Sequence, residues 1–179
     1  SSARGAIWVG GVGGGWDTPA RELYPRLCRE LASEGIASLR VRFRIAAQMD
    51  EALFDTAAGL EYLHSTGATA IALTGHSLGG AVVLRAAALD PLVRAMVTLA
   101  SQSYGAGRVG ELPPGCAALF LHGTADEVLP ARCSQDLYRL AREPKRLLLF
   151  QGAGHILAEA ADQVEGAIRE WLRRYLTER

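Results

Sequence analysis

Gly75-His76-Ser77-Leu78-Gly79-Gly80 lies between a strand-like and a helix-like segment. The short apolar run before it, residues 69–74, predicts a buried strand, and the alanine-rich residues 81–89 after it predict a helix. Ser77 is thus expected at a strand-to-helix turn with the pattern G-x-S-x-G. In such a turn the serine takes a strained backbone conformation. Its hydroxyl stands clear of the chain at the amino end of the helix, where the helix dipole stabilises negative charge.

The glycines of this pattern have a predicted steric role. At positions 75 and 79 a side chain would collide with the neighbouring strand and helix, so we expect glycine to be required there. The pattern alone is weak evidence for catalysis, because a glycine-rich turn in any α/β protein can contain a serine. A catalytic role for Ser77 requires a base and an acid elsewhere in the chain.

Length and composition predict a single domain over residues 1–179. The chain has 179 residues, of which 49% are hydrophobic, and its formal net charge is zero. A chain of this size can bury a core. The basic residues near the end, Arg169, Arg173, Arg174 and Arg179, are interspersed with Glu170 and Glu178 on an amphipathic helix. They indicate a solvated helix face, so we expect no nucleic-acid partner.

Several other classes of site are predicted to be absent. Cys28, Cys116 and Cys133 lack C-x-x-C spacing and no histidine pair has metal-ligand spacing, so we expect neither a disulfide framework nor a metal site. No apolar run is long enough for a membrane span and no signal-peptide pattern opens the chain. We therefore expect a cytoplasmic protein without a membrane partner. The chain begins with Ser1 and not Met, so a removed leader stays open, as does the oligomeric state.

Strand and helix patterns alternate along the chain. The first helix is expected to begin with Thr18 as its N-cap and Pro19 at its first position, and to end near Gly35. Strands are expected at residues 6–10, 36–43, 69–74, 93–100, 117–122 and 146–150. The other helices are expected at residues 51–64, 81–89, 133–142 and 157–176. This alternation predicts a parallel sheet that is covered on both faces.

Ligands of such sheets bind outside the carboxyl ends of the strands, so the loops that follow strands are the candidate site. The loop after the first strand is Gly10-Gly11-Val12-Gly13-Gly14-Gly15. It fails the dinucleotide pattern because Trp16 or Thr18 falls where the last glycine is needed, and it fails the P-loop pattern because no Lys-Ser/Thr follows. We interpret it as a sharp turn that directs backbone N–H groups toward the site, as an oxyanion hole requires.

An acid and a histidine follow the last two predicted strands. Asp126 lies in His122-Gly123-Thr124-Ala125-Asp126, and His155 lies in Gly152-Ala153-Gly154-His155. The chain order Ser, Asp, His is the order in which the nucleophile-elbow fold carries its triad. Asp126 can accept a hydrogen bond from Nδ1–H of His155, and Nε2 of His155 can then take the proton of Ser77. These three are the predicted catalytic residues.

With these motifs the chain resembles the α/β-hydrolase family from about Ala6 to its end, and among its members the small capless lipases and esterases and the serine relatives of dienelactone hydrolase. The resemblance implies a minimal α/β fold, with a mostly parallel sheet of about six strands and helices on both faces. It implies that GHSLGG carries the nucleophile Ser77, HGTADEVLP the acid Asp126 and GAGH the base His155. The two antiparallel strands that begin larger members are expected to be missing.

The same resemblance assigns the oxyanion hole to the backbone N–H groups of Val12 and Leu78 and implies no metal or organic cofactor. The chain departs from the family at Gly10, where histidine is common. In the family that histidine supports the loop, so the departure affects the rigidity of the loop more than the chemistry. The family usually inserts a cap after the strand that ends near Ala100. Residues 101–115 leave no room for one, so we expect an open cleft.

Other residues near the expected site have alternative interpretations. Glu127 could replace Asp126 as the acid, although the spacing Gly-x-x-Asp favours Asp126. His76 is expected to point away from the nucleophile and to pack, and His122 to be a satisfied structural histidine. Trp16 and Tyr104 lie on loops at the active edge and are either walls of the substrate pocket or ordinary packing residues.

The predicted function is that of a serine hydrolase that cleaves carboxylic esters of small or medium acyl groups through an acyl-enzyme on Ser77. A thioesterase, acyltransferase or peptidase would use the same three residues, because a fold does not fix its substrate. A non-catalytic ligand-binding homologue is a further alternative from another class. The intact set of Ser77, Asp126 and His155 argues against it.

Overall fold

The computed structural model describes residues 4–177 of the chain. Its described part has six strands, five α-helices and two short 3-10 helices. The strands are β1 (Arg4–Val9), β2 (Ile36–Val41), β3 (Ala70–His76), β4 (Val93–Leu99), β5 (Ala117–Gly123) and β6 (Lys145–Phe150). The helices are α1 (Pro19–Ser33), α2 (Met49–Ser65), α3 (Leu78–Ala87), α4 (Arg132–Leu140) and α5 (Ala161–Thr177), with η1 (Gly107–Glu111) and η2 (Ala158–Ala160).

The six strands form one sheet in the order β2-β1-β3-β4-β5-β6, and every neighbouring pair is parallel. The predicted parallel sheet of about six strands is therefore confirmed. The chain adds β2 on one side of β1 and β3 on the other, so the order reverses between β1 and β3. In open α/β sheets a ligand crevice forms at such a reversal, outside the carboxyl ends of the strands.

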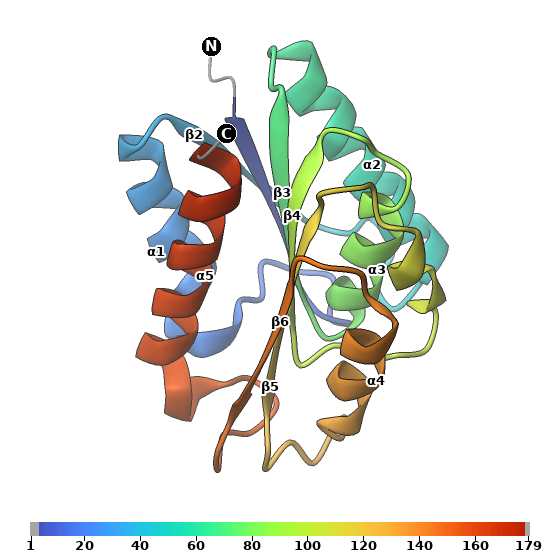
Figure 1. Ribbon diagram of the computed structural model, residues 1–179, viewed down its shortest axis with the longest axis vertical. Coiled ribbons are helices and arrows are strands. Elements are labelled where there is room, and N and C mark those ends of the chain that lie inside the picture. The colour runs from blue at the N-terminus through green and yellow to red at the C-terminus, as the bar shows by residue number, and fades with distance from the viewer. Residues whose placement is uncertain (1–3, 178–179) are drawn as a thin grey trace.

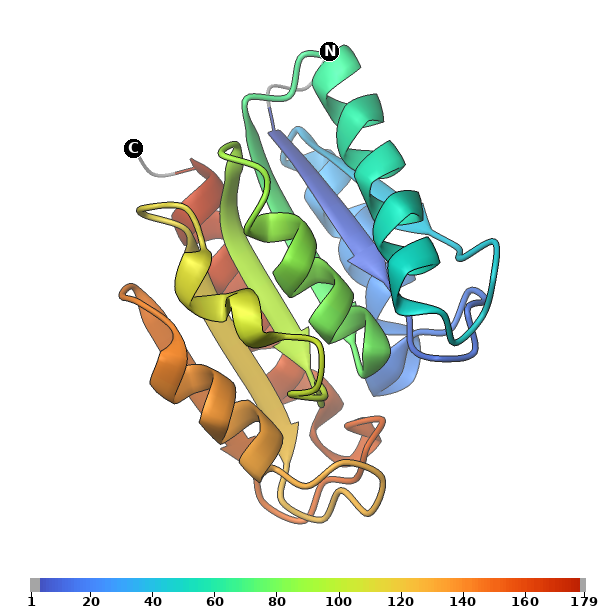
Figure 2. The ribbon, with the colours of Figure 1, turned by 90° about the vertical axis from the view of Figure 1, so that its right-hand side faces the viewer.

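Helices cover both faces of the sheet. α1 and α5 lie side by side on one face, and α2, α3 and α4 lie on the other (Figure 1, Figure 2). Each face has its own apolar core: Leu27 and Ile168 belong to the core beneath α1 and α5, and Val82 and Phe120 to the core beneath α2, α3 and α4. Because every central strand is buried on both sides, the strands read in the sequence as nearly continuous apolar runs.

The segment between β4 and β5 forms no cap. Residues 101–116 contain only the short helix η1, which packs against α3 and α4. The expectation of a fold without a cap is confirmed. No helix among residues 4–177 is both long and apolar enough to cross a membrane.

The start of α1 differs from its prediction. Ala20, Arg21 and Glu22 have φ angles of 49°, 53° and 62°, in the left-handed region that L residues avoid. The right-handed helix begins only after them, and the Thr18 hydroxyl accepts a hydrogen bond from the backbone N–H of Tyr24 at 2.9 Å. Thr18 is the N-cap and Pro19 the first position, as predicted, but the residues that follow them form a left-handed turn before the regular helix begins.

The last predicted helix also begins later than expected. Leu157 has a φ of 56°, η2 follows it, and regular helix starts at Ala161. The apolar spacing of residues 157–176 predicted one helix because Leu157 is fully buried in the same core as the helix face. Leu157 is therefore buried in the core without being part of the helix.

Candidate active site

Ser77 lies on the sharp turn between β3 and α3. Its φ of 55° and ψ of −119° are strained for an L residue. A Cβ on Gly75 would overlap the carbonyl oxygen of Gly79, and a Cβ on Gly79 would overlap the carbonyl oxygen of Gly10. The predicted steric need for glycine at both positions is confirmed. The turn can form because three stretches of backbone approach one another where side chains are missing.

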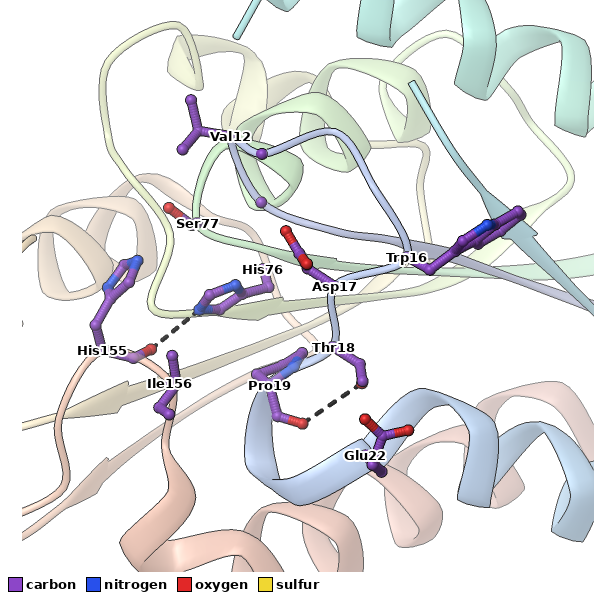
Figure 3. A pocket seen from close by; sticks show the side chains of 12 residues that line it. Val12, Trp16, Asp17, Thr18, Pro19, Glu22, His76, Ser77, His155 and Ile156 are labelled. Carbon is purple, nitrogen blue, oxygen red and sulfur yellow. Dashed lines mark hydrogen bonds between the residues drawn. The ribbon is translucent and has the colours of Figure 1, made fainter. Parts of the chain in front are cut away.

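The Ser77 side chain opens into a pocket of about 430 Å³ at the reversal of strand order. Only 8% of Ser77 is exposed, and its hydroxyl has no hydrogen-bond partner among the described residues. The loop after β1, the turn that opens α1 and the loop after β6 form the walls (Figure 3). The lining residues are Gly11, Val12, Gly13, Trp16, Asp17, Thr18, Pro19, Glu22, His76, Ser77, His155 and Ile156.

His155 and Asp126 are joined by a hydrogen bond. Nδ1–H of His155 donates to Oδ2 of Asp126 at 2.8 Å, which leaves Nε2 as the acceptor nitrogen. Oδ1 of Asp126 accepts the backbone N–H groups of Val128 and Leu129, both at 2.8 Å. Burial of the Asp126 carboxyl raises its pKa, but these two amides and His155 outweigh that effect and hold the pKa below its ordinary value. Asp126 is therefore an ionised partner for His155.

Ser77 and His155 line the same pocket from different elements. No hydrogen bond joins the Ser77 hydroxyl to His155 within residues 4–177. Such contacts are often long in an unliganded site and tighten when substrate binds. The loops that carry Asp126 and His155 are joined directly, because Ala125 N–H donates to the carbonyl oxygen of Ala153 at 3.0 Å and Gly152 N–H donates to the Thr124 hydroxyl at 2.9 Å.

The glycine loop after β1 lies beside the nucleophile. A Cβ built on Gly11 would stand 3.6 Å from Cβ of Ser77, and the loop carries Val12 at the edge of the pocket. The backbone N–H groups of Val12 and Leu78 have no hydrogen-bond acceptor within the described part of the chain. Leu78 is the first residue of α3, where N–H groups have no intrahelical acceptor. Two free donors thus adjoin Ser77.

Solved structures with this architecture cover almost the whole chain. A dienelactone hydrolase from Anabaena variabilis has a TM-score of 0.82 at 18% identity and covers 98% of this chain and 88% of its own. The esterase Est1E from Butyrivibrio proteoclasticus, solved with ferulic acid bound, has a TM-score of 0.81 at 18% identity over 99% and 91%. An α/β serine hydrolase without a lid from Xanthomonas campestris has a TM-score of 0.77 at 23% identity over 99% and 84%.

The chain has the α/β-hydrolase fold. No protein-family model matches the sequence. The uncharacterized protein YfhR of Escherichia coli K12 is 35% identical over 109 residues, a match that covers 48% of this chain and 38% of that protein. The proteins of that name in Salmonella typhi and Salmonella typhimurium are 33% identical over similar shares. The chain thus matches well under half of the length of these relatives.

Within this α/β-hydrolase fold, His76 occupies a place that the sequence prediction missed. Its Nε2–H donates to the carbonyl oxygen of His155 at 3.0 Å, and the centroids of the two imidazole rings are 4.8 Å apart (Figure 3). The expectation that His76 packs is confirmed, since only 8% of the residue is exposed, but it did not foresee that the ring also lines the pocket. Burial lowers the pKa of His76 to about 4, so the ring is neutral near pH 7.

His122 is the satisfied structural histidine that was expected, but one of its contacts is with the acid. Its ring is fully buried, Nδ1 accepts the Ser134 hydroxyl at 2.7 Å, and Nε2–H donates to the carbonyl oxygen of Leu129 at 2.9 Å. Nε2 also lies 3.1 Å from Oδ2 of Asp126. The spacing of four residues between His122 and Asp126 was the one signal of this contact in the sequence.

Of the two aromatic candidates for the pocket wall, only Trp16 lines the pocket. Trp16 lines the pocket, and Arg40 lies over its ring at 5.3 Å from the centroid. Tyr104 is 86% exposed and is absent from the lining, so both alternatives for it, a pocket wall and a packing residue, are wrong. Tyr104 lies in a tight turn that the hydrogen bond from Ala106 N–H to the carbonyl oxygen of Ser103 closes at 3.1 Å.

Other polar candidates are also distinguished. Glu127 is exposed and contacts neither histidine, so the structure favours Asp126 as the partner of His155. The pocket brings in two carboxylates that sequence reasoning missed, Asp17 and Glu22. Residues 4–177 contain no cluster of His, Cys, Asp and Glu side chains that could hold a metal ion, and Cys28, Cys116 and Cys133 are free thiols.

Proposed function

We propose that the chain is a serine hydrolase that cleaves carboxylic esters of small or medium acyl groups. The observation that carries this proposal is the unpartnered Ser77 hydroxyl, which a strained turn holds in the pocket that His155 also lines, with His155 bonded to Asp126. In this proposal Ser77 is the nucleophile, His155 the base and Asp126 the acid that orients the base. The named activities of the esterase and dienelactone hydrolase with this fold agree with the proposal.

The proposed mechanism forms and hydrolyses an acyl-enzyme. Nε2 of His155 takes the Ser77 proton while Oγ attacks the ester carbonyl, and Asp126 stabilises the imidazolium that results. The N–H groups of Val12 and Leu78 would donate to the oxyanion of the tetrahedral intermediate. The C–O bond to the alcohol breaks, and the alcohol leaves with the proton from His155. Water, deprotonated by His155, then attacks the acyl-enzyme; the bond between the acyl carbon and Oγ breaks, His155 returns the proton to Oγ, and the acid leaves.

The shape of the pocket supports the substrate class. A volume of about 430 Å³ is at the lower end of the usual range for small-molecule sites, and no cap covers it in the described chain. An acyl group of a few carbons fits such a space, whereas a long acyl chain would leave it. We therefore expect activity to decline with acyl length.

The test is hydrolysis of p-nitrophenyl esters from acetate to palmitate by the native chain, Ser77→Ala and the matched control Ser65→Ala, in which an exposed serine of α2 is replaced. Turnover of short esters should fall by at least about a thousandfold in Ser77→Ala and stay at the native rate in Ser65→Ala. Labelling by a fluorophosphonate should require Ser77. Equal rates in all three proteins would contradict the proposal; labelling without ester turnover would favour a thioester or amide as substrate.

A further inference from the structure

Two exposed carboxylates line the pocket without a side-chain or backbone partner among the described residues. Asp17 and Glu22 both line it, and neither makes a hydrogen bond or an ion pair within the described residues. In Figure 3 the Asp17 carboxylate lies beside the glycine loop, where a Cβ on Gly13 would stand 2.6 Å from Oδ2, and Glu22 rises from the start of α1 at the other side of the pocket. Most other acids of the protein are paired, as Glu165 is with Arg26 and Arg169.

The pocket contains no compensating cation among the described residues. Its remaining titratable groups are His76 and His155. Arg40 stands beside Trp16 but outside the lining, and its guanidinium donates to the Trp16 carbonyl oxygen at 2.5 Å. Arg21, the neighbour of Glu22, lines a separate hollow with Glu159 at the start of α5. The pocket therefore has a negative potential when its histidines are neutral.

The backbone holds Glu22 in this place against local preference. The left-handed turn of Ala20, Arg21 and Glu22 is fixed by a hydrogen bond from Ala20 N–H to the carbonyl oxygen of Ile156 at 2.7 Å. Ile156 directly follows His155 and also lines the pocket. The turn that presents Glu22 is thus attached to the loop that presents the imidazole.

The proposed nucleophile opens into the same space as the two carboxylates. Ser77 is 8% exposed, its hydroxyl has no hydrogen-bond partner among residues 4–177, and it opens into the pocket that the two carboxylates line. We infer that the preferred substrates are esters that carry a fixed positive charge, such as an ammonium group, which Asp17 and Glu22 bind while Ser77 attacks the carbonyl. This inference rests on the proposed esterase function. The inference states that the substrate is positively charged, and the charge can be on the acyl part or on the alcohol part.

The experiment compares esters of equal shape that differ only in charge. On the alcohol side the pair is acetylcholine and 3,3-dimethylbutyl acetate; on the acyl side it is the p-nitrophenyl esters of 4-(trimethylammonio)butyrate and 5,5-dimethylhexanoate. At 10 mM salt we expect kcat/KM to favour the cationic ester of at least one pair by about tenfold. The preference should shrink at 150 mM salt, because the Debye length falls from about 30 Å to about 8 Å.

Variants assign the preference to the two side chains. The ratio of kcat/KM for the cationic ester to that for the neutral ester should fall toward one in Asp17→Asn/Glu22→Gln and below one in Glu22→Lys. It should stay at the native value in Glu61→Gln, which removes an equally unpaired carboxylate from the exposed end of α2. The charged and neutral esters are compared within each variant, so a general loss of activity does not alter the ratio.

Three results would overturn the inference. Equal kcat/KM for both members of both pairs would overturn it and leave the esterase function intact. A native-like ratio in the double variant would show that other groups bind the cation. Absence of Ser77-dependent turnover for every ester, p-nitrophenyl acetate included, would overturn the proposed function and the inference together.

Discussion

Ser77 and His155 line one pocket, but the chain fixes them by different means. The Ser77 turn depends on the absence of side chains, since Gly75 and Gly79 let three backbone segments meet. The His155 ring depends on polar contacts to residues far away in the sequence: Asp126 holds Nδ1, and His76 holds the carbonyl oxygen. The first arrangement is local and steric, and the second is distant and electrostatic. The two should therefore fail in different ways when they are perturbed.

The largest effect is expected from the steric side. Gly79→Ala places a methyl group on the carbonyl oxygen of Gly10, and backbone on both sides must move, so we expect a loss of more than about 3 kcal/mol of unfolding free energy. Gly166→Ala is the matched control, because its Cβ meets nothing within 4 Å and alanine favours the helix by about 0.5–1 kcal/mol. Urea denaturation measures both. Equal effects of the two changes would refute the steric interpretation of the turn.

A second perturbation acts on the polar side through pH. The pKa of His76 falls from its ordinary value of 6.5 to about 4 on burial, so the unfolded chain binds a proton in that range and the folded chain does not. Stability is then complete above pH 6.5 and falls by about 3 kcal/mol as the pH drops to 4. The lowered pKa of Asp126 acts only below its ordinary value of 3.8, as its carboxylate is protonated.

His76→Gln checks this assignment because glutamine keeps an N–H donor and does not titrate. Unfolding free energies measured from pH 7 to pH 4 should show a shallower slope in this variant than in the native chain. An unchanged slope would mean that another group carries the pH dependence.

A smaller effect is expected where a polar contact only positions the acid. His122→Phe removes the donor that lies 3.1 Å from Asp126, so we expect kcat for a short ester to fall about tenfold with little change in KM. Ser134→Ala removes the hydrogen bond on the opposite ring nitrogen and leaves the contact with Asp126. It should reduce stability while kcat is retained. A matching loss of kcat in both variants would assign His122 a purely structural role.

The smallest effect is expected from polar contacts that position nothing in the pocket. Glu30 pairs with Arg169 and Arg173 across α1 and α5, and all three side chains are partly exposed. Glu30→Gln should cost less than about 1 kcal/mol, and the cost should decline in 0.5 M salt. Thermal unfolding at two salt concentrations measures it. A cost that does not depend on salt would indicate packing instead of charge.

The same contrast explains what the sequence could predict. Apolar periodicity and glycine placement report short-range sterics, and they predicted the six strands, the parallel sheet and the turn at Ser77. They also brought Asp126 and His155 to one edge, because residues that follow parallel strands meet there. Apolar periodicity and glycine placement do not predict where a side chain on a loop points. Tyr104 was therefore expected as a pocket wall or a packing residue and lies in solvent, while His76 was expected to point away from the nucleophile and pack, and its ring lines the pocket.

The residues that were missed depend on backbone conformations without a sequence signal. Thr18 and Pro19 have the preferences of a helix start, and only the hydrogen bond from Ala20 to Ile156, made late in the chain, shows why a left-handed turn forms instead. That turn brings Glu22 to the pocket, five residues after Asp17. Contacts over more than a hundred residues are invisible to local patterns.

The position of β6 at the edge of the sheet has a consequence for the lifetime of the site. Ser77 follows β3, which is enclosed between β1 and β4, whereas His155 follows a strand that is paired only with β5 and has one buried residue, Phe150. Edge elements fray at lower free energy than central ones. We therefore expect that, on warming, β6 and the loop that carries His155 unfold locally before the whole protein unfolds. Inactivation would then precede global unfolding and be reversed on cooling, and amide hydrogens of β6 would exchange sooner than those of β3.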